Sequence, residues 1–169
     1  MRRLLIGLVL AGVTALPVAA CGGSGMSAGD AQALREQADR LQIDQIEAKF
    51  HQALSTKNVD LMMSLWAPHA TFTVGAGRTL TGKAQIRAFW LRDAPGFQPE
   101  NHWIWSTSPY KIRITINGSR GALFFECYAF DTRTREVKAA TAADMQVAKT
   151  SGKWLITNNA GANISTLTP

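Results

Sequence analysis

Residues 111–130 read KIRITINGSRGALFFECYAF, and this stretch decides the fold. Ile112, Ile114 and Ile116 alternate with more polar residues, which is the period of a β-strand with one buried face. The step Asn117-Gly118 favours a tight turn, and the apolar segment from 122 to 130 supplies a second strand. The sequence therefore predicts an antiparallel hairpin here.

Helical patterns precede this hairpin. Apolar residues recur every three or four positions from about Ala31 to Thr56, which predicts an amphipathic helix. Shorter helices are predicted at residues 59–66 and between 82 and 95, with a short strand at 71–74 between them. Residues 150–152, TSG, predict another hairpin near the end of the chain. Helices first and an antiparallel meander afterwards indicate an α+β fold, with the helices gathered against one face of a curved sheet.

The start of the chain resembles a bacterial lipoprotein signal. Two arginines precede an apolar stretch that is short for a bilayer span, and the run Val18-Ala19-Ala20-Cys21 ends it. We expect residues 1–20 to be a signal peptide, Cys21 to carry the lipid, and 21–30 to be a flexible tether rich in Gly and Ser before a domain at 31–169. The alternative is an ordinary secretory signal. Both place the mature protein outside the cytoplasm, and the first places it on the extracytoplasmic face of the cell membrane.

Composition narrows the possible partners. Removal of residues 1–20 leaves 149 of the 169 residues, enough for one domain with a sizeable core. The charge is moderately positive with no run of Lys or Arg, which argues against binding to nucleic acid and is compatible with a position near a membrane surface.

The sequence has two cysteines, so a lipidated Cys21 leaves Cys127 without a disulfide partner. The three histidines form no metal-binding motif, and no cofactor motif is present.

Residues 53–72, ALSTKNVDLMMSLWAPHATF, resemble the opening of the SnoaL-like and nuclear transport factor 2-like superfamily. The segment from Thr81 to Trp90 resembles the family's third helix, and TSGKWLI at 150–156 resembles its last hairpin. The resemblance implies a cone, in which a curved antiparallel sheet wraps around the N-terminal helices and leaves a central pocket. Family members use that pocket for ligand binding or for catalysis, and fold alone does not separate the two.

The ketosteroid isomerases of this superfamily offer a catalytic pattern to test. They use a base carboxylate, a tyrosine and a neutral carboxylic acid. By the resemblance, the tyrosine position falls on Phe50, the base position on Val74, and only the acid matches, at Asp144. Because the base and one hydroxyl are missing, isomerase chemistry by that mechanism is not expected.

The last hairpin supplies the candidate ligand-binding residues. With residues 150–152 as its loop, Asp144 lies opposite Asn158, on a face that mixes polar and apolar groups as a pocket lining does. We expect Asp144 and Asn158 to orient a small, mostly apolar ligand, with apolar surface from Phe50, Trp66 and Trp105. The alternative is that Asp144 is structural, hydrogen-bonded to Asn158 or to backbone.

His102 is the remaining candidate, because it lies beside Trp103 and Trp105 and is expected at the pocket mouth. An enzyme of the dehydratase, cyclase or hydrolase type, acting on a hydrophobic carbonyl compound, would use His102 as base and Asp144 as its partner or as a neutral acid. The plainer interpretation of His102 is a packing or surface histidine.

A third possibility is an interaction module of the cell envelope, including a homodimer, that uses a sheet face carrying Phe124, Tyr128, Met145 and Val147.

The sequence of the first hairpin also predicts which residues pair across its two strands. If Ile116 pairs with Gly121, Lys111 falls opposite Glu126 and forms an ion pair on the face away from the isoleucines.

Overall fold

The computed structural model describes residues 26–75 and 77–160. Its elements follow the predicted order of helices and then a meander, and the α+β class is confirmed. No helix in these described ranges is long and apolar enough to cross a membrane. In chain order the elements are α1 (Ala28–Thr56), α2 (Val59–Ser64), β1 (Trp66–Val74), β2 (Arg78–Thr81), α3 (Gly82–Arg92), η1 (Pro95–Phe97), β3 (Trp103–Ser106), η2 (Pro109–Lys111), β4 (Ile112–Asn117), β5 (Arg120–Asp131), β6 (Val137–Thr150) and β7 (Lys153–Asn159).

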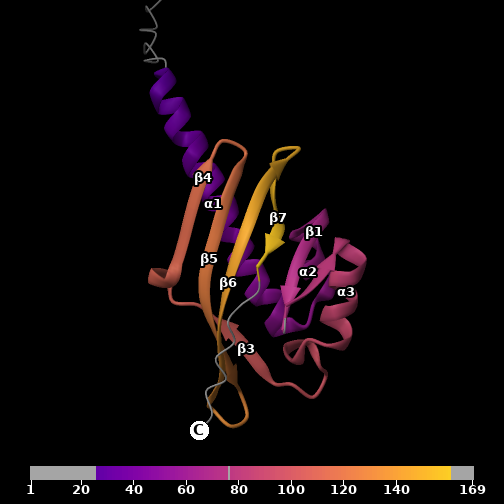
Figure 1. Cartoon of the computed structure of the whole chain (residues 1–169). Coiled ribbons are helices and arrows are strands. Elements are labelled where there is room, and N and C mark those ends of the chain that lie inside the picture. Colours follow the sequence, from indigo (N-terminus) through magenta and orange to yellow (C-terminus); the bar gives the residue numbers. More distant parts are fainter. Residues whose placement is uncertain (1–25, 76, 161–169) are drawn as a thin grey trace, which may run out of the picture.

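The seven strands form one curved sheet in the order β2-β1-β7-β6-β5-β3, with β4 also paired to β5. Helix α1 runs along one face of β4, β5 and β6, while α2 and α3 gather beside β1 (Figure 1). The sheet is mixed and not purely antiparallel, because β1 pairs in parallel with β7. This pairing joins the helical half of the chain to its last strand.

Helix α1 begins at Ala28, three residues before the predicted start. Ser27 caps it, since its hydroxyl accepts a hydrogen bond from the Asp30 backbone N–H and the Asp30 carboxylate accepts one from the Ser27 backbone N–H. The helix ends at Lys57, whose left-handed backbone (φ 55°) lets its N–H donate to the carbonyls of Ala53 and Leu54. The buried face of α1 starts only at Ile43, and the first turns of the helix extend past the sheet (Figure 1).

The first hairpin has the predicted register. Ile116 pairs with Gly121, and Lys111 Nζ lies 2.9 Å from a Glu126 carboxylate oxygen. The predicted cross-strand ion pair is therefore confirmed.

The predicted register of the last hairpin is wrong. Ser151 and Gly152 form a two-residue turn with φ of 50° and 78°, so Thr150 pairs with Lys153 and belongs to β6 instead of to the loop. A β-bulge between Gln146 and Val147 then shifts the pairing again, and Gln146 lies opposite Asn158.

This register fixes which side of β6 faces the core. Met145 and Val147 are fully buried, whereas Asp144 and Gln146 are exposed. The surface proposed from sequence for partner binding therefore cannot contain Met145 and Val147, because a one-residue slip exchanges the two faces of a strand.

Candidate functional site

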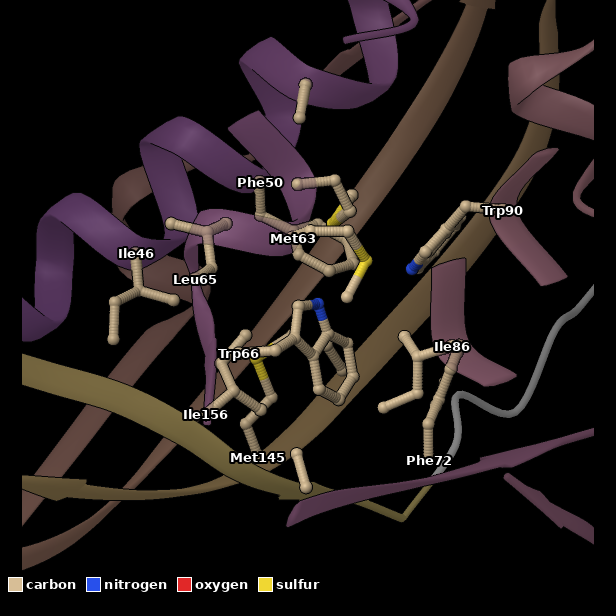
Figure 2. Packing of buried hydrophobic residues seen from close by; sticks show 14 of the residues in the cluster. Ile46, Phe50, Met63, Leu65, Trp66, Phe72, Ile86, Trp90, Met145 and Ile156 are labelled. Carbon is tan, nitrogen blue, oxygen red and sulfur yellow. The ribbon is translucent and has the colours of Figure 1, made fainter. Parts of the chain in front are cut away.

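Two tryptophans bring hydrogen-bond donors into the apolar interior. Trp66 is the first residue of β1, and Trp90 lies near the end of α3. Their exposed fractions are 0% and 6%. Neither indole N–H has a hydrogen-bond partner among the described residues. Figure 2 shows both indole nitrogens directed toward Met63, which comes from α2.

Aromatic rings surround these two donors. The Trp66 and Phe72 ring centroids are 5.3 Å apart, Phe72 stacks on Trp90 at 5.6 Å, and Phe50 of α1 contacts Trp90 edge-on at 5.7 Å. We call these four residues, Phe50, Trp66, Phe72 and Trp90, the aromatic shell. Its residues come from α1, β1 and α3, so three separate elements meet in this part of the core.

The arrangement favours a particular kind of ligand. A buried donor without an acceptor costs roughly 1–3 kcal/mol, and here two such donors face one apolar region. Met63 has an unbranched, flexible side chain that can change its packing, so it is suited to give way to a bound molecule. An apolar molecule with a single acceptor atom would therefore complement the two indole donors.

A second polar cluster lies on α1, against the sheet. Glu47 and His51 are one helical turn apart, and His51 Nδ1 is 2.7 Å from Glu47 Oε1. Both residues are buried, with exposed fractions of 8% and 6%. The His51 ring packs edge-on against Phe125 of β5 at 5.2 Å between centroids, and its Nε2 lies 3.5 Å from the Thr107 hydroxyl.

A groove lies along α1, on the N-terminal side of this pair. It has a volume of about 450 Å³ and lies between α1 and the segment that runs from η2 into β4. Asp44 lines it one turn before Glu47, and Pro109 lines it two residues after Thr107. The groove and the Glu47–His51 pair therefore use neighbouring stretches of the chain, but neither Glu47 nor His51 lines the groove. Its full lining is Gln37, Arg40, Leu41, Asp44, Pro109, Ile112 and Ile114.

Comparison with known proteins agrees with this architecture. The family model described as "SnoaL-like domain" matches residues 35–159, well over half of the chain. The protein belongs to the SnoaL-like family. Among curated protein sequences, none matches this SnoaL-like protein.

Several solved structures share the fold at low sequence identity. A nuclear transport factor 2-like protein with a cystatin-like fold from Novosphingobium aromaticivorans has a TM-score of 0.69 and 17% identity, over 83% of this chain and 90% of that one. A hexachlorocyclohexane dehydrochlorinase from Novosphingobium barchaimii has a TM-score of 0.66 and 15% identity, over 81% and 93%. A protein of unknown function from Nostoc punctiforme has a TM-score of 0.65 and 17% identity, over 78% and 95%. These matches show the fold alone.

The SnoaL-like cone brings three of the predicted apolar residues to its inside. Phe50 and Trp66 are buried in the aromatic shell. Trp105 is half-buried on β3 and packs over Gly96, where an added Cβ would lie 3.3 Å from its Nε1. Its backbone N–H donates to the Ser55 hydroxyl at 2.8 Å, which joins β3 to α1.

The polar candidates lie elsewhere. Asp144 pairs with Phe124 on the exposed face of the sheet, and its backbone carbonyl accepts from the Ala160 N–H at 3.0 Å. Asn158 does not meet Asp144, and its amide nitrogen donates to the Thr71 hydroxyl at 2.6 Å. The Asn158 side chain is therefore bonded to β1 and not to Asp144, and a ligand role for Asp144 or Asn158 stays a prediction.

His102 and Asp144 are far apart in the sheet. His102 lies just before β3, and its carbonyl accepts hydrogen bonds from Thr132. Trp103, the next residue, pairs with Asp131, which is seven residues along β5 from the partner of Asp144. At ~3.3 Å per residue this is roughly 23 Å, so the two side chains are not brought together for proton transfer. A separate ligand contact by His102 stays a prediction.

Cys127 is a buried free cysteine that packs as a small apolar residue. Its exposed fraction is 3%, and its thiol lies 2.8 Å from the Thr141 hydroxyl. Burial raises the pKa of the thiol to about 11, and the nearby Glu47 carboxylate acts in the same direction. A thiol with this pKa remains protonated near neutral pH and is a poor nucleophile.

The sequence did not identify Glu47, His51 or Trp90 as site residues. The spacing of Glu47 and His51 on either side of buried Phe50 was the available signal, because residues four apart on a helix share a face. The structure shows that His51 faces the core.

Proposed function

We propose that this protein binds a small, mostly apolar ligand inside its cone, and that a lipid on Cys21 holds it at the extracytoplasmic face of the cell membrane. The observation that carries the ligand proposal is the pair of buried indole donors, Trp66 and Trp90, inside the aromatic shell. A bound acceptor atom would recover their hydrogen-bonding energy, while the surrounding rings would contact the rest of the molecule.

The chemistry of the shell selects the ligand class. Both unpaired groups are hydrogen-bond donors, so the complementary group on the ligand is an acceptor. Examples are a carbonyl oxygen, an ether oxygen or a halogen atom on a carbon framework. A charged ligand is disfavoured, since burying an ion among aromatic rings carries a large desolvation cost. That one protein of this fold is a hexachlorocyclohexane dehydrochlorinase supports a small, largely apolar molecule as the occupant of such a cone.

The ligand proposal is tested by native mass spectrometry of the protein purified from its own host. We expect a stoichiometric small molecule in the wild type, and a dissociation constant about tenfold higher, with lower occupancy at limiting ligand, in Trp66→Phe and in Trp90→Phe, because each loses one donor of about 1.4 kcal/mol. Trp103→Phe is the matched control, since Trp103 lies on β3 outside the aromatic shell.

Thermal melts of all three variants separate loss of ligand from loss of folding. Equal occupancy in the wild type, Trp66→Phe and Trp90→Phe would show that the indole donors do not hold the ligand. Occupancy lost in Trp103→Phe alone would move the site to β3, near the predicted candidates His102 and Trp105.

The anchoring proposal rests on the sequence pattern that ends at Cys21. We expect the wild-type chain to sediment with the membrane fraction, and Cys21→Ser to be released into the soluble extracytoplasmic fraction, because a serine cannot carry the thioether-linked lipid. Cys127→Ser is the control for loss of a thiol. Membrane association retained by Cys21→Ser would favour the ordinary secretory signal combined with another mode of attachment.

A further inference from the structure

Helix α1 carries apolar residues on two faces. One face packs into the core from Ile43 onwards. The other holds Ala31, Leu34, Ala38 and Leu41, and its centre lies roughly 140° round the helix from the buried face at about 100° per residue. Leu34 and Leu41 are 53% and 58% exposed, so this second face is open to solvent. We call these four residues the outer stripe.

The outer stripe has the spacing of a coiled coil. Its residues are separated by three, four and three positions, which places alanine at position a and leucine at position d of a heptad repeat. Gln45 and Ala48 continue the same two positions for another heptad, and both are exposed. Leucines at this spacing form the seam along which two helices pack. The outer stripe therefore fits a second helix of the same kind.

The structure presents the outer stripe on a helix that is already formed. Ser27 caps α1, the core holds it from Ile43 onwards, and its first turns extend past the sheet (Figure 1). A free peptide of this length loses free energy to helix formation when it associates, whereas a helix held by a folded domain does not. Because the core lies against the other face of α1, a partner on the outer stripe meets the exposed side of the helix.

The residues that flank the outer stripe are complementary to a second copy of this chain in parallel orientation. In a parallel pair, each residue at position g lies near the residue at position e five places later in the other helix. Position g is acidic or polar, and position e is basic or polar. The resulting pairs are Asp30 with Arg35, Gln37 with Gln42, and Asp44 with Lys49.

An antiparallel pair would bring like charges together. It places position g near position g and position e near position e, so acidic residues meet acidic ones and basic residues meet basic ones. Arg35 and Lys49 are exposed, and neither has a hydrogen bond or ion pair with another residue that the structure describes. Both side chains are therefore available to a partner.

We propose that two copies of this chain associate in parallel along the outer stripe, with Leu34 and Leu41 buried between the two α1 helices. A parallel pair begins both helices at the same end, so the two Cys21 residues would reach the same membrane. A shared membrane would raise the effective concentration of the copies for each other. The pairing itself rests neither on the lipid nor on a ligand at Trp66 and Trp90, because it uses other residues.

Cysteine crosslinking of the full-length chain in its own host tests the pairing. In a parallel pair in register, position 45 of one copy meets position 45 of the other, so Gln45→Cys should form a disulfide-linked dimer on mild oxidation. Ala33→Cys is the matched control, because Ala33 is also exposed but lies roughly 120° round the helix from the outer stripe. It should crosslink about tenfold more slowly, since distant cysteines cannot be bridged. The wild type gives the background from Cys21, while Cys127 is buried.

Charge reversal distinguishes the parallel pair from other arrangements. In the Gln45→Cys chain, Lys49→Glu would place two acidic residues together on each side of the pair, and the crosslinking rate should fall about tenfold. Addition of Asp44→Lys restores opposite charges and should restore the rate. In an antiparallel pair, Lys49→Glu would instead relieve repulsion between basic residues and strengthen association.

Leu34→Gln tests the apolar seam. Leu34 is exposed and lies before the buried part of α1, so its replacement should leave the melting temperature unchanged and lower the crosslinking rate about tenfold. Equal rates for Gln45→Cys and Ala33→Cys, a rate unchanged or raised by Lys49→Glu, or a rate unchanged by Leu34→Gln would each overturn the proposal. A Gln45→Cys chain that crosslinks in the soluble fraction would contradict the lipid anchor and still support the pairing.

Discussion

Replacing Gly121 with alanine should destabilise the protein by about 3 kcal/mol, at the upper end of the cost of overpacking a core. Gly121 pairs with Ile116 on one side and Val147 on the other. An added Cβ would lie 2.5 Å from the Thr115 carbonyl oxygen, 3.3 Å from Val147 Cγ2 and 3.6 Å from Ile43 Cδ1. Since the closest atom belongs to the backbone, rotation of a side chain cannot relieve the contact, and the strand or α1 must move.

Chemical denaturation of Gly121→Ala and the wild type measures this effect. The control is Ala122→Gly, at the next residue of β5, where loss of a methyl group should cost about 0.5–1 kcal/mol through backbone freedom alone. If Gly121→Ala were as stable as the wild type, the close approach of β4 and α1 to this glycine would be incorrect.

Replacing Asp39 with asparagine should cost about 2 kcal/mol at neutral pH. The Asp39 carboxylate accepts from Lys149 Nζ at 2.6 Å and from the Trp154 indole N–H at 3.0 Å, and its side chain is 15% exposed. The variant keeps one acceptor oxygen but leaves the Lys149 ammonium without its charged partner. Hydrogen bonds to charged groups contribute about 1.5–3 kcal/mol.

The same residue gives a pH dependence. The hydrogen bond from Lys149, with that from Trp154, holds the pKa of Asp39 below its ordinary value of 3.8. A lowered pKa in the folded state means that the stabilisation is complete above pH 3.8 and is lost as the pH falls through the folded-state value. The difference between wild type and Asp39→Asn should therefore be constant near neutral pH and shrink below about pH 4.

Asp93→Asn is the control for Asp39→Asn, because Asp93 pairs with Arg78 at 2.9 Å in an exposed setting, with side chains 47% and 60% exposed. We expect a cost below about 1 kcal/mol for this pair. An equal cost for the two variants, or a difference between wild type and Asp39→Asn that does not change with pH, would contradict the assigned role of Asp39.

The two hairpins show what could be predicted about the sheet. Asn117-Gly118 strongly favours a tight turn, so the register that places Lys111 opposite Glu126 could be predicted from the sequence. At the last hairpin, Ser151 adopts a positive φ without being glycine, and a bulge follows within five residues. Neither feature has a clear local signal, and together they reversed the predicted faces of β6.

The site was harder to predict, because it depends on how α1 is rotated against the sheet. Large apolar residues such as Phe50 and Trp66 could be predicted to lie inside from their type alone. Glu47 and His51 could not, since charged residues usually face water and only the observed packing shows that this face of the helix is buried. The orphan indole donors are likewise a property of the folded interior.

The part of α1 that extends past the sheet sets a stand-off distance if Cys21 holds the chain at a bilayer. The residues before Gln37 are mostly exposed and helical from Ala28, which gives nine residues, or roughly 13 Å, of rigid rod beyond the groove (Figure 1). Such a rod would space the groove by a fixed length from the end of the predicted tether. Molecules leaving the membrane would then have to cross that length before they meet the cone.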